Sequence, residues 1–136
     1  MDWSFLTGLL NFTLYYGIAL VLLVVFKFIY TWITPHDEWA LIKEEKNTAA
    51  AIAFGGAIIG FAIALGGAAT NSVSIADFIL WAIVALGAQI LAFGLVRFVF
   101  MPKIISRIKN DEISAAVMLC AISIAAGILN AACMSY

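Results

Sequence analysis

The sequence predicts an all-α integral membrane protein with four transmembrane helices, and its composition is the first reason. Of the 136 residues, 65% are apolar and only 11% are charged, whereas charged residues form about a quarter of an ordinary soluble domain. The second reason is that apolar residues gather in four stretches near the length of roughly 20 residues that a helix needs to cross the hydrocarbon core. No alternating strand pattern is present, so each stretch is expected to be a helix, whose backbone groups bond internally.

The four expected spans leave little chain between them, so residues 1–136 are expected to form one transmembrane domain. Lys27 and Arg97 interrupt the first and third spans near one end. They are expected to extend their charged heads into the lipid headgroups. With approximate ends, the spans are Phe5–Ile33, Thr48–Ala68, Asp77–Phe100 and Ile113–Met134.

The distribution of basic residues predicts the orientation. All seven Lys and Arg residues flank the first and third loops, and none lies near the termini or in the loop at 67–76. Because basic residues are retained on the cytoplasmic side, both termini are expected outside the cytoplasm and the two basic loops inside it. The seven are Lys27, Lys43, Lys46, Arg97, Lys103, Arg107 and Lys109.

The chain also shows an internal similarity. The segment beginning Thr48-Ala49-Ala50 resembles the segment beginning Ser114-Ala115-Ala116, and each follows a charged loop that begins near a proline, Pro35 or Pro102. This shared order favours a duplication of a two-helix unit, with repeats at about 5–68 and 77–134. Because each unit crosses the membrane twice, the two copies would be parallel repeats about an axis near the membrane normal.

Both basic loops are expected to contain local helix. Thr34-Pro35 is typical of a helix start, with an N-cap followed by proline at the first helical position, and this helix should continue through Lys43. In the second loop Ile104, Ile105 and Ile108 would share one face, opposite the cations Lys103 and Arg107. That amphipathic segment is expected to lie flat on the inner leaflet.

Small residues mark the second and fourth spans. Inside a bilayer apolar surface has already left water, so helices associate through close backbone contact, which small side chains permit. The first and third spans, richer in Leu, Val, Ile and Phe, are better suited to face lipid. We therefore expect the second and fourth spans to form the centre of a homo-oligomeric assembly, with packing stripes at Gly56, Gly60, Ala64, Ser123, Gly127 and Ala131.

Few polar groups lie within the spans. Gln89 and Asn130 are predicted to form interhelical hydrogen bonds, with a pore-lining role as the alternative. Mid-membrane Asp, Glu and His are absent, which argues against a proton-coupled carrier.

No pattern of catalytic or cofactor-binding residues is present, so an enzyme is not expected. His36, Asp37 and Glu38 are consecutive at a helix start and could not all face one metal ion. Cys120 and Cys133 are 13 residues apart on one helix, or about 20 Å, so they are expected to be free thiols. No metal, cofactor or nucleic-acid partner is expected.

Three stretches resemble a known family. The run Ile33-Thr34-Pro35-His36-Asp37-Glu38-Trp39, the following Asn47-Thr48-Ala49-Ala50 and the ending Asn130-Ala131-Ala132-Cys133-Met134 are similar to the YjfL-type bacterial inner-membrane proteins. The resemblance covers nearly the whole chain and implies a four-span inner-membrane protein with an internal duplication. It also implies a setting among envelope-stress and polyamine-related genes, including a glutathionylspermidine-synthase-like enzyme and a phage-shock-like membrane-binding protein. It supplies no activity and no catalytic residues.

Two functional hypotheses follow. The first is a non-enzymatic oligomeric protein that organises or stabilises the inner membrane during stress. In that role its basic loops would contact anionic lipid or a peripheral stress protein, although the positive-inside rule alone also explains these cations. The second is a channel or small-solute exporter with a pore formed between subunits. The cations concerned are Lys43, Lys46, Lys103, Arg107 and Lys109.

Overall fold

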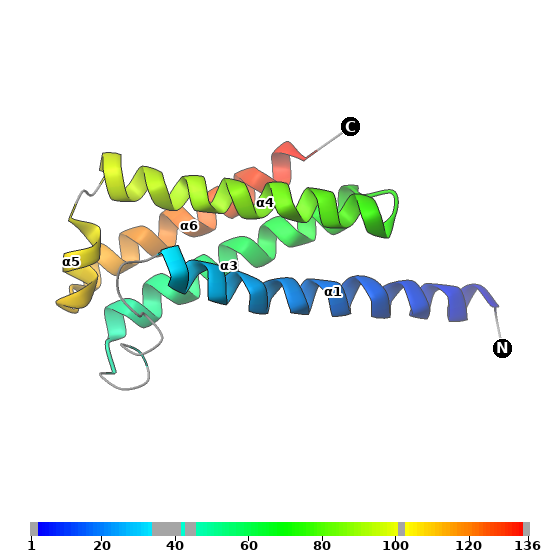
Figure 1. Ribbon diagram of the computed structural model, residues 1–136, viewed down its shortest axis with the longest axis horizontal. Helices are drawn as coiled ribbons and strands as arrows, with labels where there is room; N and C mark the ends of the chain where they lie inside the picture. Colours follow the sequence, from blue (N-terminus) through cyan, green and yellow to red (C-terminus); the bar gives the residue numbers. More distant parts are fainter. Residues whose placement is uncertain (1–2, 34–41, 43–45, 101–102, 135–136) are drawn as a thin grey trace.

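The computed structural model describes residues 3–33, 42, 46–100 and 103–134, and these form a bundle of long helices (Figure 1). Four helices are each long and apolar enough to cross a membrane, which confirms the predicted all-α, four-span fold. A π-helical turn, η1 (Val96–Phe100), and a short helix, α5 (Ile104–Lys109), follow the third of them. The four long helices are α1 (Trp3–Ile33), α3 (Thr48–Asn71), α4 (Ile75–Leu95) and α6 (Ile113–Cys133).

The turn between α3 and α4 is shorter than the sequence suggests. Helix α3 continues to Asn71, and α4 begins at Ile75, so only residues 72–74 connect them. The start of α4 is fixed by a reciprocal cap. The Ser74 hydroxyl accepts a hydrogen bond from the Asp77 backbone N–H at 3.2 Å, and the Asp77 carboxylate accepts one from the Val73 N–H at 2.9 Å. Such caps satisfy backbone donors that the first helical turn leaves open.

Helix α3 is the central element of the bundle. In Figure 1, α1 and α4 run along its sides, α6 runs parallel to it, and both chain termini lie at the end away from α5. Of the 18-residue apolar stretch that marks each span, 56% is buried within the subunit in α3, but only 17% in α6 and 6% in α1. Within one subunit α3 is therefore the most buried span, while the expectation that the second and fourth spans form the centre of a homo-oligomer stays a prediction. Helix α6 packs against α3 and also bonds to α4, and the rest of its surface is exposed.

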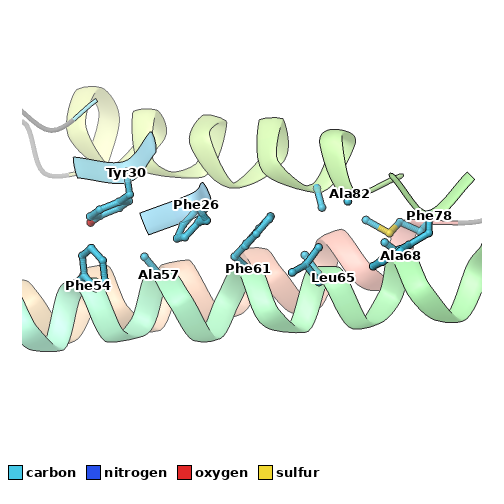
Figure 2. Close-up of a cluster of buried hydrophobic side chains, with 12 residues drawn as sticks. Phe26, Tyr30, Phe54, Ala57, Phe61, Leu65, Ala68, Phe78 and Ala82 are labelled. Atoms are coloured by element: carbon cyan, nitrogen blue, oxygen red, sulfur yellow. The ribbon is translucent and has the colours of Figure 1, made fainter. Parts of the chain in front are cut away.

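Helix α1 is attached to the bundle by aromatic side chains (Figure 2). The rings of Phe26 and Phe61 stack with centroids 4.5 Å apart, and Tyr30 meets Phe54 edge-on at 5.4 Å. All four side chains are buried. At the other end of α1, Tyr15 lies 5.1 Å from Phe78 of α4. These rings hold the α1 backbone at a distance from α3.

The second loop differs from its prediction in where its apolar face points. Ile104 and Ile108 of α5 are each 1% exposed and pack against the small residues that begin α3 and α6, so they contact protein rather than lipid. The small side chains of Ala49, Ala50 and Ala115 leave room for them. In Figure 1, α5 lies across the end of the bundle.

The structure does not test two of the predictions made from the sequence. The helix predicted over Thr34–Lys43 falls outside the described residues except for Ile42, which is helical. The duplication stays a prediction. The two halves share one backbone feature. Lys46 and Asp111 lie two positions before α3 and α6, respectively, and both have positive φ, at 51° and 58°.

Candidate functional site

Helices α3 and α6 touch backbone to backbone at their crossing. A Cβ atom added at Gly127 would lie 2.7 Å from both the carbonyl carbon and the Cα of Gly60. A Cβ added at Gly60 would overlap the backbone oxygen of Ser123. Since ordinary carbon contacts lie at about 3.5–4.0 Å, no side chain fits at either position. These two glycines and Ser123 belong to the predicted packing stripes.

The contact extends in both directions from this crossing. Towards the α5 end, a Cβ on Gly56 would meet the Cα of Cys120 at 2.6 Å, and towards the other end one on Gly67 would meet the Cα of Ala131 at 2.6 Å. Ala64 is fully buried. The packing stripes predicted from the sequence did not include Gly67 and Cys120. Which residues meet depends on the angle at which the two helices cross, and the spacing of small residues does not give that angle.

Polar side chains join α4 to α6 beside this crossing. The Gln89 side-chain amide donates to the Ser123 backbone oxygen at 3.3 Å. The Asn130 amide donates to the Ala85 backbone oxygen at 3.0 Å and lies 3.5 Å from the Gln89 amide oxygen. Gln89 is 6% exposed. Both amides therefore form hydrogen bonds between helices inside one subunit, as polar groups in membrane bundles commonly do.

A small cavity adjoins Gln89 and Ser123. Its volume is about 10 Å³, and Phe26, Tyr30, Ala57 and Phe93 are among its other lining residues. That is room for about one water molecule. Around this cavity aromatic rings fill the space between α1, α3 and α4, as Figure 2 shows for Phe26, Tyr30 and Phe61.

A second group of polar contacts ties together the α5 end of the bundle. Asn47 caps α3 by accepting from the Ala50 N–H at 2.8 Å, and its amide donates to the backbone oxygens of Ile108 and Lys109 at 3.0 and 3.3 Å. The Asp111 carboxylate accepts from the Ala49 N–H at 2.8 Å. Side chains from the α5–α6 turn thus complete the N-terminus of α3. Sequence reasoning missed this junction, because its partners are more than 60 residues apart.

The predicted cationic residues lie around the same junction. Lys46, Lys103 and Lys109 are exposed, while Arg107 forms an ion pair with Glu112 in which both side chains are about half exposed. An exposed pair of this kind contributes little stability. Lys43 lies outside the described residues. These four cations are therefore spread over the exposed surface of the α5 end and do not enclose a ligand-binding site.

The cysteines differ in environment. Cys120 is half-buried against Gly56, and Cys133 is exposed near the end of α6. Both are free thiols. Among the described residues, no group of three His, Cys, Asp or Glu side chains could hold a metal ion, and His36, Asp37 and Glu38 lie outside them.

Comparison with known proteins decides the family. A family model described as Domain of Unknown Function (DUF350) matches residues 4–134. The chain belongs to this family. It is 44% identical over 131 residues to the UPF0719 inner membrane protein YjfL of Escherichia coli (strain K12), covering 96% of this chain and 98% of that protein, and equally to its counterpart from Escherichia coli O157:H7. No solved structure matches.

This relationship agrees with the four apolar helices and identifies a multi-pass inner-membrane protein. It confirms the resemblance drawn from the motifs around Thr34 and Asn130. The feature to be explained is therefore a helix bundle with backbone contact between α3 and α6, in which the side-chain amides of the spans form hydrogen bonds to neighbouring helices of the same subunit.

Proposed function

We propose that this chain is a non-enzymatic, oligomeric inner-membrane protein that organises or stabilises the membrane during envelope stress. One observation carries the proposal: the intramembrane amides of Gln89 and Asn130 bond to neighbouring helices within a single subunit. Groups committed in this way stabilise a bundle and are not free to bind a substrate. The cavity beside them holds about one water molecule and offers no path for a solute.

The alternative of a channel between subunits makes a different demand on the same residues. A pore edged by Gln89 or Asn130 would require these amides to leave their present partners and face a second subunit. Oligomerisation would instead use outward faces of the bundle, such as those of α1 and α6, where most side chains are exposed.

The proposal is tested by measuring flux and physiology with the same variants. In proteoliposomes the full chain should give no conductance above protein-free vesicles, while a strain lacking the gene should become sensitive to agents that perturb the envelope and recover with the wild-type copy. Conductance of the wild-type chain above that of protein-free vesicles, altered in ion selectivity by Gln89→Glu or Asn130→Asp, would overturn the proposal in favour of the channel. Normal tolerance of the deletion strain to such agents would also overturn it.

We further propose that the exposed cations at the α5 end contact anionic headgroups or an acidic surface of a peripheral stress protein, with both chain termini on the periplasmic side. Lys46, Lys103 and Lys109 surround the junction that Asn47 and Asp111 hold rigid. A cation near an anionic leaflet contributes about 1 kcal/mol. Replacing the three lysines by Gln should therefore reduce enrichment of phosphatidylglycerol around the protein in mixed bilayers. Unchanged enrichment would refute the lipid contact.

A further inference from the structure

An open groove lies between α1 and α3 at the side of the bundle. It has a volume of about 340 Å³. Its α1 wall runs from Phe12 to Leu23, and its α3 wall consists of Ala62, Leu65, Gly66 and Ala69. Aromatic rings separate α1 from α3, whereas α6 touches the α3 backbone directly. Aromatic contacts at Phe26–Phe61 and Tyr15–Phe78 hold α1 at both ends of this stretch, which leaves the groove between them.

From this geometry we infer that the groove is a binding site for one acyl chain of a phospholipid, lying along α1 in the leaflet nearer the chain termini. The lining is almost wholly hydrocarbon and aromatic, and a groove on a membrane-spanning helix opens onto lipid tails. The inference does not depend on the proposed function. A channel and a scaffold would carry this groove alike.

The length of the groove matches one leaflet. Phe12 and Leu23 are 11 residues apart, which corresponds to about 16 Å along a helix, and half of the hydrocarbon core is about 15 Å. The groove also has the appropriate depth. Phe61, opposite Phe26, is near the middle of α3, and Ala69 is near the end of α3 at Asn71. Along α3 the groove therefore runs from the middle of the helix towards its C-terminal end.

The cross-section of the groove distinguishes the occupants. A volume of 340 Å³ over about 16 Å of helix gives a mean cross-section of about 20 Å². A hydrocarbon chain, with carbon contacts at about 4 Å, has a width of about 4–5 Å and fits that area. A helix of a second copy, about 10 Å across, would lay only its side chains over the opening, whereas an acyl chain can lie within the groove along its length.

Packing against α6 does not explain the small residues Gly66 and Ala62 of the α3 wall. On the α6 side of α3, a Cβ at Gly56, Gly60 or Gly67 would collide with α6. A Cβ at Gly66 would meet nothing within 4 Å, and Ala62 is exposed. Close helix packing therefore accounts for the first three glycines, while the missing side chain at Gly66 keeps the groove open.

The test uses a phospholipid with a photoactivatable group on one acyl chain, reconstituted with the full-length protein in bilayers. After irradiation, label is mapped to peptides by mass spectrometry. We expect about threefold or more label on residues 12–23 and 62–69 than on the equally apolar outer face of α4 at residues 79–84. Gly66→Leu should abolish that excess, because its side chain enters the groove. The matched control Gly87→Leu should keep it, because a Cβ at Gly87 of α4 meets nothing within 4 Å and lies outside the groove.

Three outcomes would overturn the inference. Label spread in proportion to exposure over all four helices would mean that the groove holds no chain in preference to bulk lipid. An excess that persists in Gly66→Leu would place the lipid elsewhere. Cross-linking of Ala69→Cys into disulfide-linked dimers, with no lipid label on the groove, would show a second subunit as the occupant. Should Gly66→Leu fail to fold, the wild-type labelling pattern decides the matter alone.

Discussion

Replacing Gly127 by Ala should separate the two helices at the heart of the bundle. The added Cβ would lie 2.7 Å from the carbonyl carbon and from the Cα of Gly60, against an ordinary carbon contact of about 3.5 Å, so α3 and α6 must part by about 0.8 Å. The atoms in the way are backbone, and no rotamer change can relieve them. A gap of that size forfeits a quarter to a half of the dispersion attraction of the atoms beside it. We expect a loss of about 1–3 kcal/mol in the free energy of unfolding, as for other overpacked cores.

This loss is measured by titrating the detergent-solubilised protein with SDS and following helix content. The matched control is Gly87→Ala, because Gly87 lies on α4 with nothing within 4 Å of an added Cβ. It should unfold at the wild-type midpoint or slightly above it, since Ala favours helix over Gly. Equal midpoints for Gly127→Ala and Gly87→Ala would refute the backbone contact between α3 and α6.

Three further predictions concern other parts of the chain. Phe26→Ala should lower the free energy of unfolding by about 3 kcal/mol, because Phe26 is 3% exposed and stacks on Phe61. The control Phe28→Ala, at a position 60% exposed, should change it little. Equal effects of the two substitutions would contradict the packing of α1. Asn47→Ala should cost about 1–3 kcal/mol through loss of its cap and its bonds to Ile108 and Lys109, with the exposed Asn110→Ala as control; an unchanged SDS midpoint would refute the junction. In intact cells treated with a membrane-impermeant maleimide, Cys133 should be labelled and Cys120 should not, because Cys133 is exposed near the end of α6 that we place in the periplasm; labelling of Cys133 only after the cells are broken would reverse the orientation.

Much of the architecture follows from composition. Backbone N–H and C=O groups inside a bilayer must form hydrogen bonds within the protein, so four apolar stretches are expected to be helices. Their ends were predicted to within a few residues. The error at Asn71 has a local cause. The polar residues Thr70 and Asn71 suggested a loop, but their side chains bond back to Gly66 and Gly67 at 2.8 Å each and continue the helix.

The tertiary details were less accessible. The spacing Gly56, Gly60, Ala64 indicates one smooth face of α3, yet it does not reveal that Gly67 is the next glycine in contact with α6, because that depends on how α6 crosses. The role of α5 was also misjudged. Its apolar residues suit a lipid surface as well as a protein surface, and only the neighbouring Ala49 and Ala115 decide that they pack against the bundle.

Disulfide formation between α3 and α6 tests the central contact most directly. In a Cys133→Ser background, Gly56→Cys should form an intramolecular disulfide with Cys120 on mild oxidation. A Cβ at Gly56 would lie 2.8 Å from the Cβ of Cys120, so the two helices need to part by only about 1 Å to reach the usual Cβ–Cβ distance of about 3.8 Å in a disulfide. Gly55→Cys should not, since a Cβ there meets nothing within 4 Å. A monomer that loses both free thiols only in the Gly56→Cys variant is the predicted result. Equal bonding by Gly55→Cys, or disulfide-linked dimers in place of the monomer, would contradict the account.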